Sequence, residues 1–167
     1  YKDQHSKFLY PTEFIVRAFL GTYPNLQPIK INKNKEKILD LGFGDGRNTA
    51  FLCDLGLDVH GIEISTEIVK NTSTRLKNLG FSPNLKVGHN NSIPFPKNYF
   101  DYILSSFCIY YCTEDSNLDS NMSEYLRVLK NNGFLIANFA DANSYIFDDA
   151  ENLKDGTFII KKDPYGN

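Results

Sequence analysis

The 167 residues suit one domain and are enough to bury a hydrophobic core. Hydrophobic residues make up 41% and charged residues 23% of the chain, and the net charge is −2, a balance typical of globular proteins that leaves no large basic excess for binding a phosphate backbone. No apolar run reaches the length of a membrane span, so the composition disfavours both DNA and a membrane as partners.

Segments with helical spacing alternate with short apolar segments along the chain. In PTEFIVRAFLG, apolar residues three and four positions apart predict a helix that begins after Thr12 and ends at Gly21. Further helices are expected at 46–56, 65–80 and 121–133, with a weaker helical pattern at 143–153. Strands are expected at 37–42, 58–65, 84–91, 100–111, 133–140 and 156–162.

Strands that alternate with helices of about 10–15 residues are typical of βαβ units. We therefore predict an α/β fold with a doubly wound, mostly parallel sheet and helices on both faces. Residues 1–167 are expected to form a single domain. Within it, residues 1–36 form an N-terminal helical segment that either closes the site as a lid or only covers the sheet.

The segment KILDLGFGDGRNTAFL places Gly42, Gly44 and Gly46 directly after a predicted strand. Glycine permits positive φ angles and close approach of the backbone to a ligand, at the sheet edge where α/β proteins bind ligands. A tight connection alone would also explain these glycines. Glu63, however, ends the next strand about 20 residues later, where a carboxylate can bind both hydroxyls of a ribose. The combination predicts a nucleoside ligand, with a surface role for Glu63 as the alternative.

The glycine spacing G-x-G-x-G differs from the dinucleotide-binding pattern G-x-G-x-x-G, because Arg47 stands at the position of the last glycine. Asp40 and Asp45 flank the turn and would repel a diphosphate held at the helix N-terminus. The turn therefore favours a ligand that carries positive charge beside its ribose. The same spacing disfavours a nicotinamide-dependent oxidoreductase.

Four blocks, in this order, resemble those of class I S-adenosylmethionine-dependent methyltransferases: LDLGFGDG, GIEIS, GHNNSIPFPKNYFDYILSSFCIYY and YLRVLKNNGFLIANF. The resemblance implies a Rossmann-like methyltransferase fold with S-adenosyl-L-methionine as the cofactor. In that family the sheet usually ends with a seventh strand inserted antiparallel between the fifth and the sixth. The chain stops just after its expected sixth strand, so we expect the seventh strand to be missing and the C-terminus to be truncated.

The resemblance assigns a set of residues to the cofactor. They are Asp40, Gly42, Gly44, Gly46, Arg47, Glu63, Ile64, Asn90, Asn91, Ser106 and Tyr10. Asp40 and the glycine backbone are expected around the methionine end, Glu63 on the ribose and Ile64 on the adenine face. Arg47, Asn48 or Thr49 at the start of the helix is expected to bind the cofactor carboxylate, and a solvated helix residue is the alternative for Arg47.

The adenine contact departs from the family pattern. His89 stands where relatives often have an acid that accepts a hydrogen bond from the adenine amino group. We expect the amide oxygen of Asn90, or backbone groups at Asn90 and Asn91, to replace it. A proton-transfer role for His89 is the less favoured alternative.

The acceptor side is expected around Ser105, Ser106 and Tyr110, towards the end of the predicted fourth strand, where the methyl group leaves. Tyr110 and Tyr111 are candidates for orienting the acceptor through their hydroxyl groups, although core packing is the stronger expectation for Tyr111. Tyr10 and Arg17 are candidate lid contacts. No general base is evident, and an acceptor that is already nucleophilic needs none, so the catalytic residues stay unassigned.

The sequence says less about the acceptor. The fourth strand lacks the Asn/Asp-Pro-Pro-Tyr/Phe element that family members use on nucleic acid bases. We predict methyl transfer to a small-molecule acceptor by in-line displacement. A protein or tRNA methyltransferase is one alternative, and a non-catalytic module that only binds S-adenosylmethionine or S-adenosylhomocysteine is another. The oligomeric state is not predicted.

Three cysteines, Cys53, Cys108 and Cys112, are an odd number, and no partner pair stands at zinc-site spacing. We predict no metal site and reduced thiols in a cytoplasmic protein.

Overall fold

The computed structural model describes residues 10–21, 36–141, 143–153 and 156–160. The chain divides into two compact units, a large one within Phe8–Asn138 and a small one within Phe139–Asn167. Each unit is described by itself, and the single domain over 1–167 stays a prediction.

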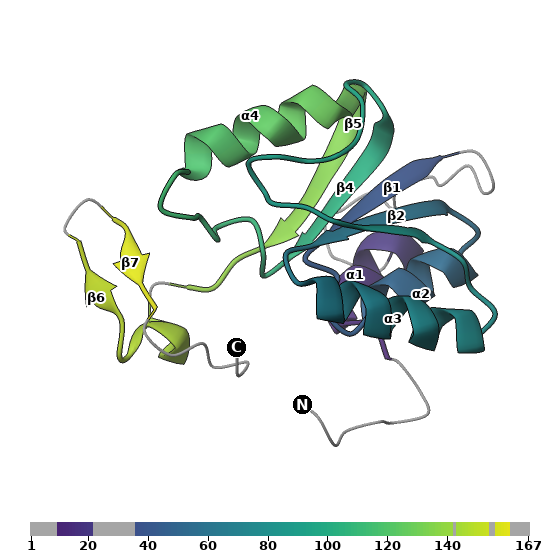
Figure 1. The fold of residues 1–167 in the computed structure, drawn as a ribbon, viewed down its shortest axis with the longest axis horizontal. Helices are drawn as coiled ribbons and strands as arrows, with labels where there is room; N and C mark the ends of the chain where they lie inside the picture. Colours follow the sequence, from purple (N-terminus) through teal and green to yellow (C-terminus); the bar gives the residue numbers. More distant parts are fainter. Residues whose placement is uncertain (1–9, 22–35, 142, 154–155, 161–167) are drawn as a thin grey trace. The chain divides into compact units, whose positions relative to one another are not determined.

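The large unit is built on a five-stranded parallel sheet with the order β3-β2-β1-β4-β5 (Figure 1). Its strands are β1 (Lys37–Leu41), β2 (Asp58–Glu63), β3 (Asn84–Val87), β4 (Phe100–Ser106) and β5 (Leu129–Asn138). The strand order reverses between β1 and β4, because the chain first winds outward to β3 and then returns to the other side of β1. The predicted parallel α/β sheet is confirmed.

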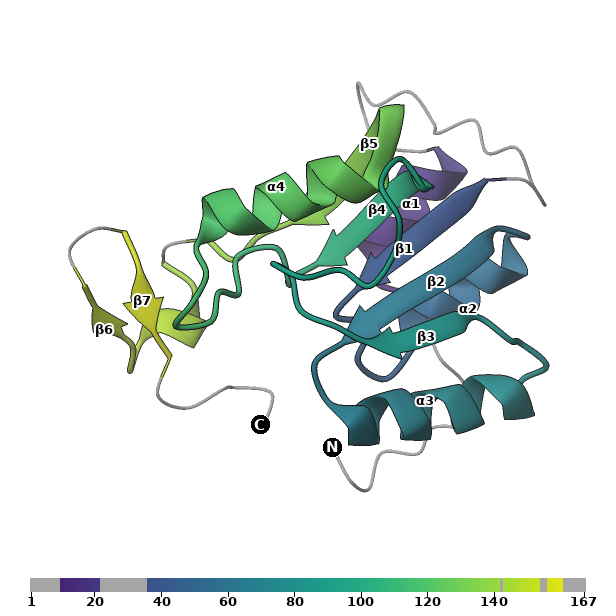
Figure 2. The same ribbon diagram turned by 45° about the horizontal axis from the view of Figure 1, so that its top comes forward.

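Helices cover both faces of this sheet, as predicted. They are α1 (Glu13–Leu20), α2 (Arg47–Asp54), α3 (Thr66–Asn78) and α4 (Leu118–Val128). Figure 2 shows α4 on one side of the sheet and α2 and α3 on the other. Alternate residues of the buried strands supply two cores, as the period of a strand requires. Ile38 packs in one core with residues of α1 and α2, whereas Leu39 packs in the other with Tyr125 of α4.

The helix ends follow local chemistry. Gly21 adopts a left-handed conformation with φ 79°, and its N–H donates to the Arg17 carbonyl to end α1. The Ser65 side chain accepts from the Ile68 N–H at the start of α3. Asn117 and Ser120 form a reciprocal capping box that starts α4. Because of this capping box, α4 begins at Leu118 and not at residue 121, where the helix was predicted to begin.

Several predicted strand boundaries are wrong, and the third strand, β3, ends at Val87 rather than at residue 91. β4 ends at Ser106 rather than at residue 111, because Phe107 takes a left-handed φ of 54° that no strand can continue. β5 begins at Leu129, directly after α4, in a region predicted as helix up to residue 133. Its pairing with β4 shifts from Phe100↔Leu129 to Tyr102↔Phe134, which accommodates a bulge.

The predicted sixth strand of the parallel sheet is also wrong. Phe158–Ile159 (β7) pairs antiparallel with Glu151–Asn152 (β6) in the small unit. The weak helical pattern before it yields one 3-10 turn, η1 (Tyr145–Phe147). A parallel return needs a crossover of about a dozen residues or more, whereas a short connection between neighbouring strands produces a hairpin.

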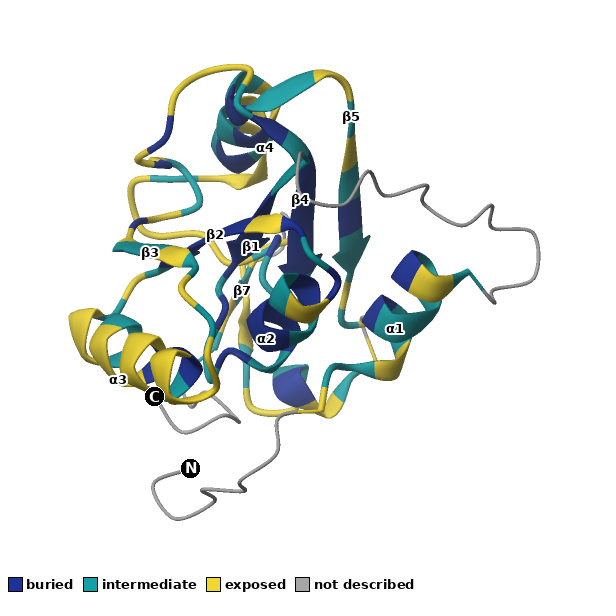
Figure 3. Cartoon of the chain, turned by 90° about the vertical axis from the view of Figure 1, so that its right-hand side faces the viewer, coloured by how far each residue is buried: buried dark blue, intermediate teal, exposed yellow. Residues whose placement is uncertain are grey.

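The sheet interior positions the functional edge. β1 and β4 are buried over most of their lengths (Figure 3), and because all five strands are parallel, their carboxyl ends meet at one edge. The connection from β3 to β4 packs Ile93 and Phe95 into the core beside α4. Arg127 of α4 holds this connection by donating to the carbonyls of Ile93 and Phe95, at 2.8 and 2.9 Å.

Among the residues that the structure describes, no helix is long and apolar enough to cross a membrane.

Candidate functional site

The glycine turn after β1 lies at the carboxyl edge of the sheet. Gly42, Gly44 and Gly46 all have left-handed φ angles, of 61°, 51° and 80°, which other L-residues adopt only at a cost. A Cβ on Gly42 would lie 2.6 Å from the Cys108 Sγ, and one on Gly46 would lie 2.7 Å from the Thr72 Cγ2. A Cβ on Gly44 would meet no atom within 4 Å. Two glycines thus permit close packing, and the third faces open space on the side where a Cβ would lie.

Glu63, the last residue of β2, reaches this turn. Its Oε2 accepts from the Gly44 N–H at 3.2 Å, and its Oε1 accepts from the Ile64 N–H at 2.8 Å. From the other side, the Thr72 hydroxyl of α3 donates to the Gly44 carbonyl at 2.7 Å. The structure therefore brings together the glycine turn and the distal acid that the sequence singled out. The neighbouring Ile64 side chain is 65% exposed.

Asp40 lies fully buried beneath the turn, where its Oδ2 accepts from the Thr49 hydroxyl at 2.7 Å. Burial raises the pKa of this carboxyl from 3.8 to about 7, and the charges of Glu63 and Asp45 add to the rise, whereas the Thr49 hydrogen bond opposes it. Three carboxyl groups thus act on one another around a single turn. This arrangement suits a cationic ligand and is unfavourable for a diphosphate.

The raised pKa of Asp40 predicts a pH-dependent difference in stability between the wild type and Asp40→Asn. Between about pH 4 and 7 the unfolded chain has released this proton while the folded chain still holds it, so the wild-type free energy of unfolding falls as the pH rises. Above about pH 7 the wild-type free energy of unfolding falls no further from this cause. Asp40→Asn keeps an acceptor for Thr49 without the titration, so it should gain about 2–4 kcal/mol relative to the wild type across this window. Denaturant unfolding of both proteins at several pH values measures the gain, and a difference that stays constant with pH would contradict it.

Arg47 begins α2 and is held against the turn by Asp45. Its backbone N–H, Nε and Nη2 all donate to the Asp45 carboxylate, at 3.2, 3.1 and 2.9 Å. The Arg47 guanidinium therefore lies beside the N-terminus of α2. The first turn of α2 also contributes Thr49, whose hydroxyl binds Asp40.

A second group of predicted residues follows β3 and β4. Asn90 and Asn91 occupy the centre of a tight turn that is closed by paired backbone bonds between His89 and Ser92. The Asn90 amide nitrogen donates to the carbonyls of Cys108 and Tyr111, a contact that the sequence did not suggest.

Ser106 ends β4 at the same edge, with the two candidate tyrosines just beyond it. The rings of Tyr110 and Tyr111 lie 5.0 Å apart. The structure reverses the expectation for this pair, because Tyr110 packs against the core and Tyr111 is exposed. A strand continuing to residue 111 would have buried Tyr111, but the chain turns at Phe107.

The N-terminal segment approaches the start of α2. The Thr12 N–H donates to the Asn48 Oδ1 at 3.1 Å, which brings Tyr10 into this neighbourhood as an exposed side chain. Arg17 forms an ion pair with Glu13 on the exposed side of α1, while Ile15 is buried against the sheet. The helix thus covers the sheet. The remainder of the proposed 1–36 lid, residues 1–9 and 22–35, lies outside the described residues.

Thr72 contributes to the turn although no sequence motif indicated it. It lies four residues before the buried Leu76 and is itself buried, so it is a polar residue on the apolar face of α3. That position is the signal that could have identified it, because a buried hydroxyl needs a hydrogen-bond partner.

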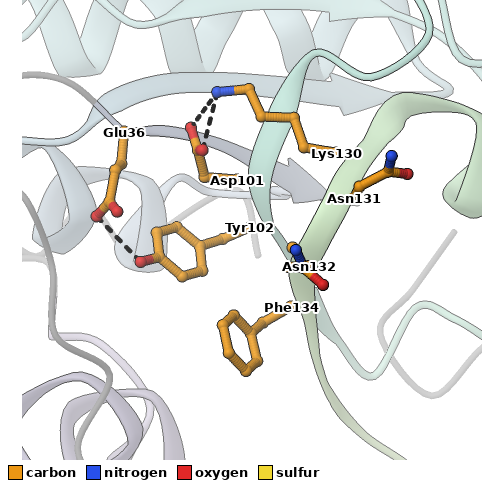
Figure 4. Close-up of a pocket in the computed structure, with 8 residues that line it drawn as sticks. Glu36, Asp101, Tyr102, Lys130, Asn131, Asn132 and Phe134 are labelled. Atoms are coloured by element: carbon orange, nitrogen blue, oxygen red, sulfur yellow. Dashed lines mark hydrogen bonds and ion pairs between the residues drawn. The ribbon is translucent and has the colours of Figure 1, made fainter.

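A cavity of about 100 Å³ lies at the opposite edge, near the amino ends of β4 and β5 (Figure 4). Its charged groups are already engaged: Lys130 pairs with Asp101 at 2.8 Å, and Glu36 accepts from the Tyr102 hydroxyl at 3.0 Å. Ligands of parallel α/β sheets bind at the carboxyl ends of the strands. We therefore place the functional site at the glycine turn and not in this cavity.

Known proteins resemble this chain in sequence. A demethylmenaquinone methyltransferase from Tropheryma whipplei is 34% identical over 104 residues, which cover 60% of this chain and 40% of that protein. The ubiquinone/menaquinone biosynthesis C-methyltransferase UbiE of Vibrio cholerae is 35% identical over 106 residues, with the same coverage. The chain thus spans about 40% of the length of these relatives.

Solved structures and a family model agree with these relatives. A S-adenosylmethionine-dependent methyltransferase from Aquifex aeolicus superposes with a TM-score of 0.55 at 26% identity, covering 63% of this chain and 56% of that one. The model of the methyltransferase domain matches residues 39–137, which run from β1 through the glycine turn and Glu63 to the end of β5. The chain therefore belongs to the methyltransferase-domain family, whose cofactor is S-adenosylmethionine.

Proposed function

We propose that this protein transfers a methyl group from S-adenosylmethionine to a small-molecule acceptor. The observation that carries the proposal is the open space at Gly44 beside the Glu63 carboxylate, within a turn that is flanked by Asp40 and Asp45. A ribose hydroxyl can hydrogen-bond to the Glu63 carboxylate, and the acidic surroundings stabilise the sulfonium and ammonium charges. The same surroundings argue against a nicotinamide dinucleotide.

In this proposal the cofactor extends along the carboxyl edge of the sheet. Glu63 binds the ribose, and the exposed Ile64 packs on the adenine, to which the backbone of Asn91 adds polar contacts. The turn Gly42–Gly46 lines the methionine end, whose amino group meets backbone carbonyls near Gly42. Arg47 binds the cofactor carboxylate, aided by the N-terminus of α2, whose dipole favours an anion. Ser106 and Tyr10 border the site from β4 and from the N-terminal segment.

The cofactor supplies an activated methyl group, so the protein has to align the acceptor and exclude water. Alignment alone can contribute up to about 7–11 kcal/mol to lowering a barrier. Tyr110 and Tyr111 stand beyond β4, where their hydroxyl groups can orient an acceptor. The names of the quinone methyltransferases among the relatives make a demethylated quinone the first acceptor to test.

The proposal is tested first by calorimetric titration of the full chain with S-adenosylhomocysteine, with NAD as the control. We expect micromolar binding of S-adenosylhomocysteine and none of NAD. Binding of NAD instead would overturn the proposal.

Turnover separates an enzyme from a module that only binds the cofactor. The assay follows transfer of a labelled methyl group from S-adenosylmethionine to a short-chain demethylmenaquinone, which we expect to be methylated. Cofactor binding without transfer to the quinone or to a panel of other small molecules would favour the binding module.

A further inference from the structure

The segment Phe107–Cys112, which directly follows β4, lies against the glycine turn. Its first residue has a φ of 54° and donates its N–H to the Asn138 Oδ1 at 2.9 Å. The next residue, Cys108, fills the space in which a Cβ on Gly42 would lie. The shape of this segment therefore sets the distance between the cofactor turn and the side chains that follow β4.

Asn90 connects this segment to the turn after β3. Its Nδ2 donates to the Cys108 carbonyl at 3.0 Å and to the Tyr111 carbonyl at 3.1 Å. Its Oδ1 faces the Cys108 thiol, with the Sγ 3.7 Å away. A carboxamide nitrogen has two hydrogens, and both are thus used on backbone carbonyls of one segment.

The Tyr111 carbonyl has a second amide donor. The Nδ2 of Asn121, a fully buried residue in the first turn of α4, lies 2.9 Å from it. The segment Phe107–Cys112 is therefore held from two elements, the β3–β4 connection and α4. Each link requires a neutral amide that donates, because the partners are carbonyl oxygens.

We propose that Asn90 is a positioning residue, which holds Phe107–Cys112 in the conformation that places the acceptor against the cofactor. This inference rests on the proposed function. It replaces the expectation that the Asn90 amide oxygen accepts a hydrogen bond from adenine. Asn90 acts through the backbone of Cys108 and Tyr111, and not on the reacting atoms.

Two substitutions distinguish the roles. Asn90→Asp keeps the shape and an acceptor oxygen but turns the donor into an oxygen that faces two carbonyls. Asn90→Ala removes donor and acceptor together. If Asn90 positions the segment, both variants should loosen Phe107–Cys112, and Asn90→Asp should loosen it at least as much as Asn90→Ala. If Asn90 instead binds adenine, Asn90→Asp should retain cofactor affinity and Asn90→Ala should lose it. Asn91→Ala, at the other central position of the same turn, is the matched control for hydrogen exchange without cofactor.

The first readout is amide hydrogen exchange of the full chain without cofactor. In Asn90→Ala and Asn90→Asp we expect exchange across Phe107–Cys112 to rise by about tenfold or more, since two amide–carbonyl bonds are lost. Peptides from β1 and α2 should keep wild-type exchange, which shows an intact fold. Asn91→Ala should stay within about twofold of the wild type in Phe107–Cys112. Wild-type exchange in Asn90→Asp would overturn the inference.

The second readout is the methyl-transfer assay with the quinone acceptor. In Asn90→Asp, kcat should fall about tenfold, whereas KM for S-adenosylmethionine should change by less than threefold, because the residue is not a cofactor ligand. A rise in the KM for S-adenosylmethionine with an unchanged kcat would contradict the positioning role. If the wild type does not bind S-adenosylhomocysteine, the proposed function fails, and exchange without cofactor still decides whether Asn90 holds the segment.

Discussion

Replacing Glu63 with alanine is expected to weaken S-adenosylhomocysteine binding more than a hundredfold. The wild-type carboxylate accepts from the Gly44 N–H beside open space and, in the proposed complex, accepts two hydrogen bonds from the ribose. Hydrogen bonds to charged groups contribute roughly 1.5–3 kcal/mol each, and about 1.4 kcal/mol corresponds to a factor of ten in affinity. The alanine variant also leaves the Gly44 N–H without this partner. Calorimetric titration measures the loss.

Two further variants make this result specific. Glu63→Gln keeps one acceptor oxygen and loses the charge, so its affinity should lie between those of the wild type and Glu63→Ala. Glu67→Ala removes an equal charge from the exposed first turn of α3 and should bind like the wild type. Affinity within about threefold of the wild type in Glu63→Ala would show that the ribose does not lie on this carboxylate.

Gly42→Ala is expected to lower the free energy of unfolding by about 2–5 kcal/mol. The left-handed φ of 61° costs an L-residue roughly 1–2 kcal/mol. The new Cβ would lie 2.6 Å from the Cys108 Sγ and 3.2 Å from its Cβ, and overpacking of this kind costs about 1–3 kcal/mol more. Denaturant unfolding without cofactor measures the sum.

Gly44→Ala is the matched control for this clash. Its φ of 51° imposes similar strain, but its Cβ would meet no atom within 4 Å, so we expect a loss of about 1–2 kcal/mol only. Adding Cys108→Ala to Gly42→Ala removes the sulfur and should recover part of the difference. Equal stability of the two glycine variants would mean that Cys108 does not pack against Gly42.

The parts of the site that could be predicted from the sequence depend on neighbouring positions along the chain. The turn follows its strand within a few residues, and the acid ends the next strand. In a parallel sheet these strand ends meet at one edge, so Gly44 and Glu63 could be expected side by side before the fold was known. Helix ends with a local signal, such as Gly21, were predictable for the same reason.

The contacts that were missed join residues far apart along the chain. Thr72 reaches Gly44 across 28 positions, and Asn90 reaches Cys108 across 18. No spacing rule relates such pairs, since their meeting depends on how α3 and the β3–β4 connection pack. The adenine contact expected of Asn90 was based on its position after β3. In the structure its amide binds the segment Phe107–Cys112, whose path depends on the left-handed φ of Phe107.

By itself, then, the sequence determined the parallel α/β fold, the glycine turn and its acid, and the family of the chain, because each depends on periodicity and on the order of the strands. Only the tertiary structure decided where β4 ends, which tyrosine packs against the core, and that Phe158–Ile159 pairs in a hairpin instead of joining the sheet. The physical reason is that a short apolar run is compatible with several partners. Its partner is selected by the packing and backbone hydrogen bonds of the whole unit, which local sequence does not specify.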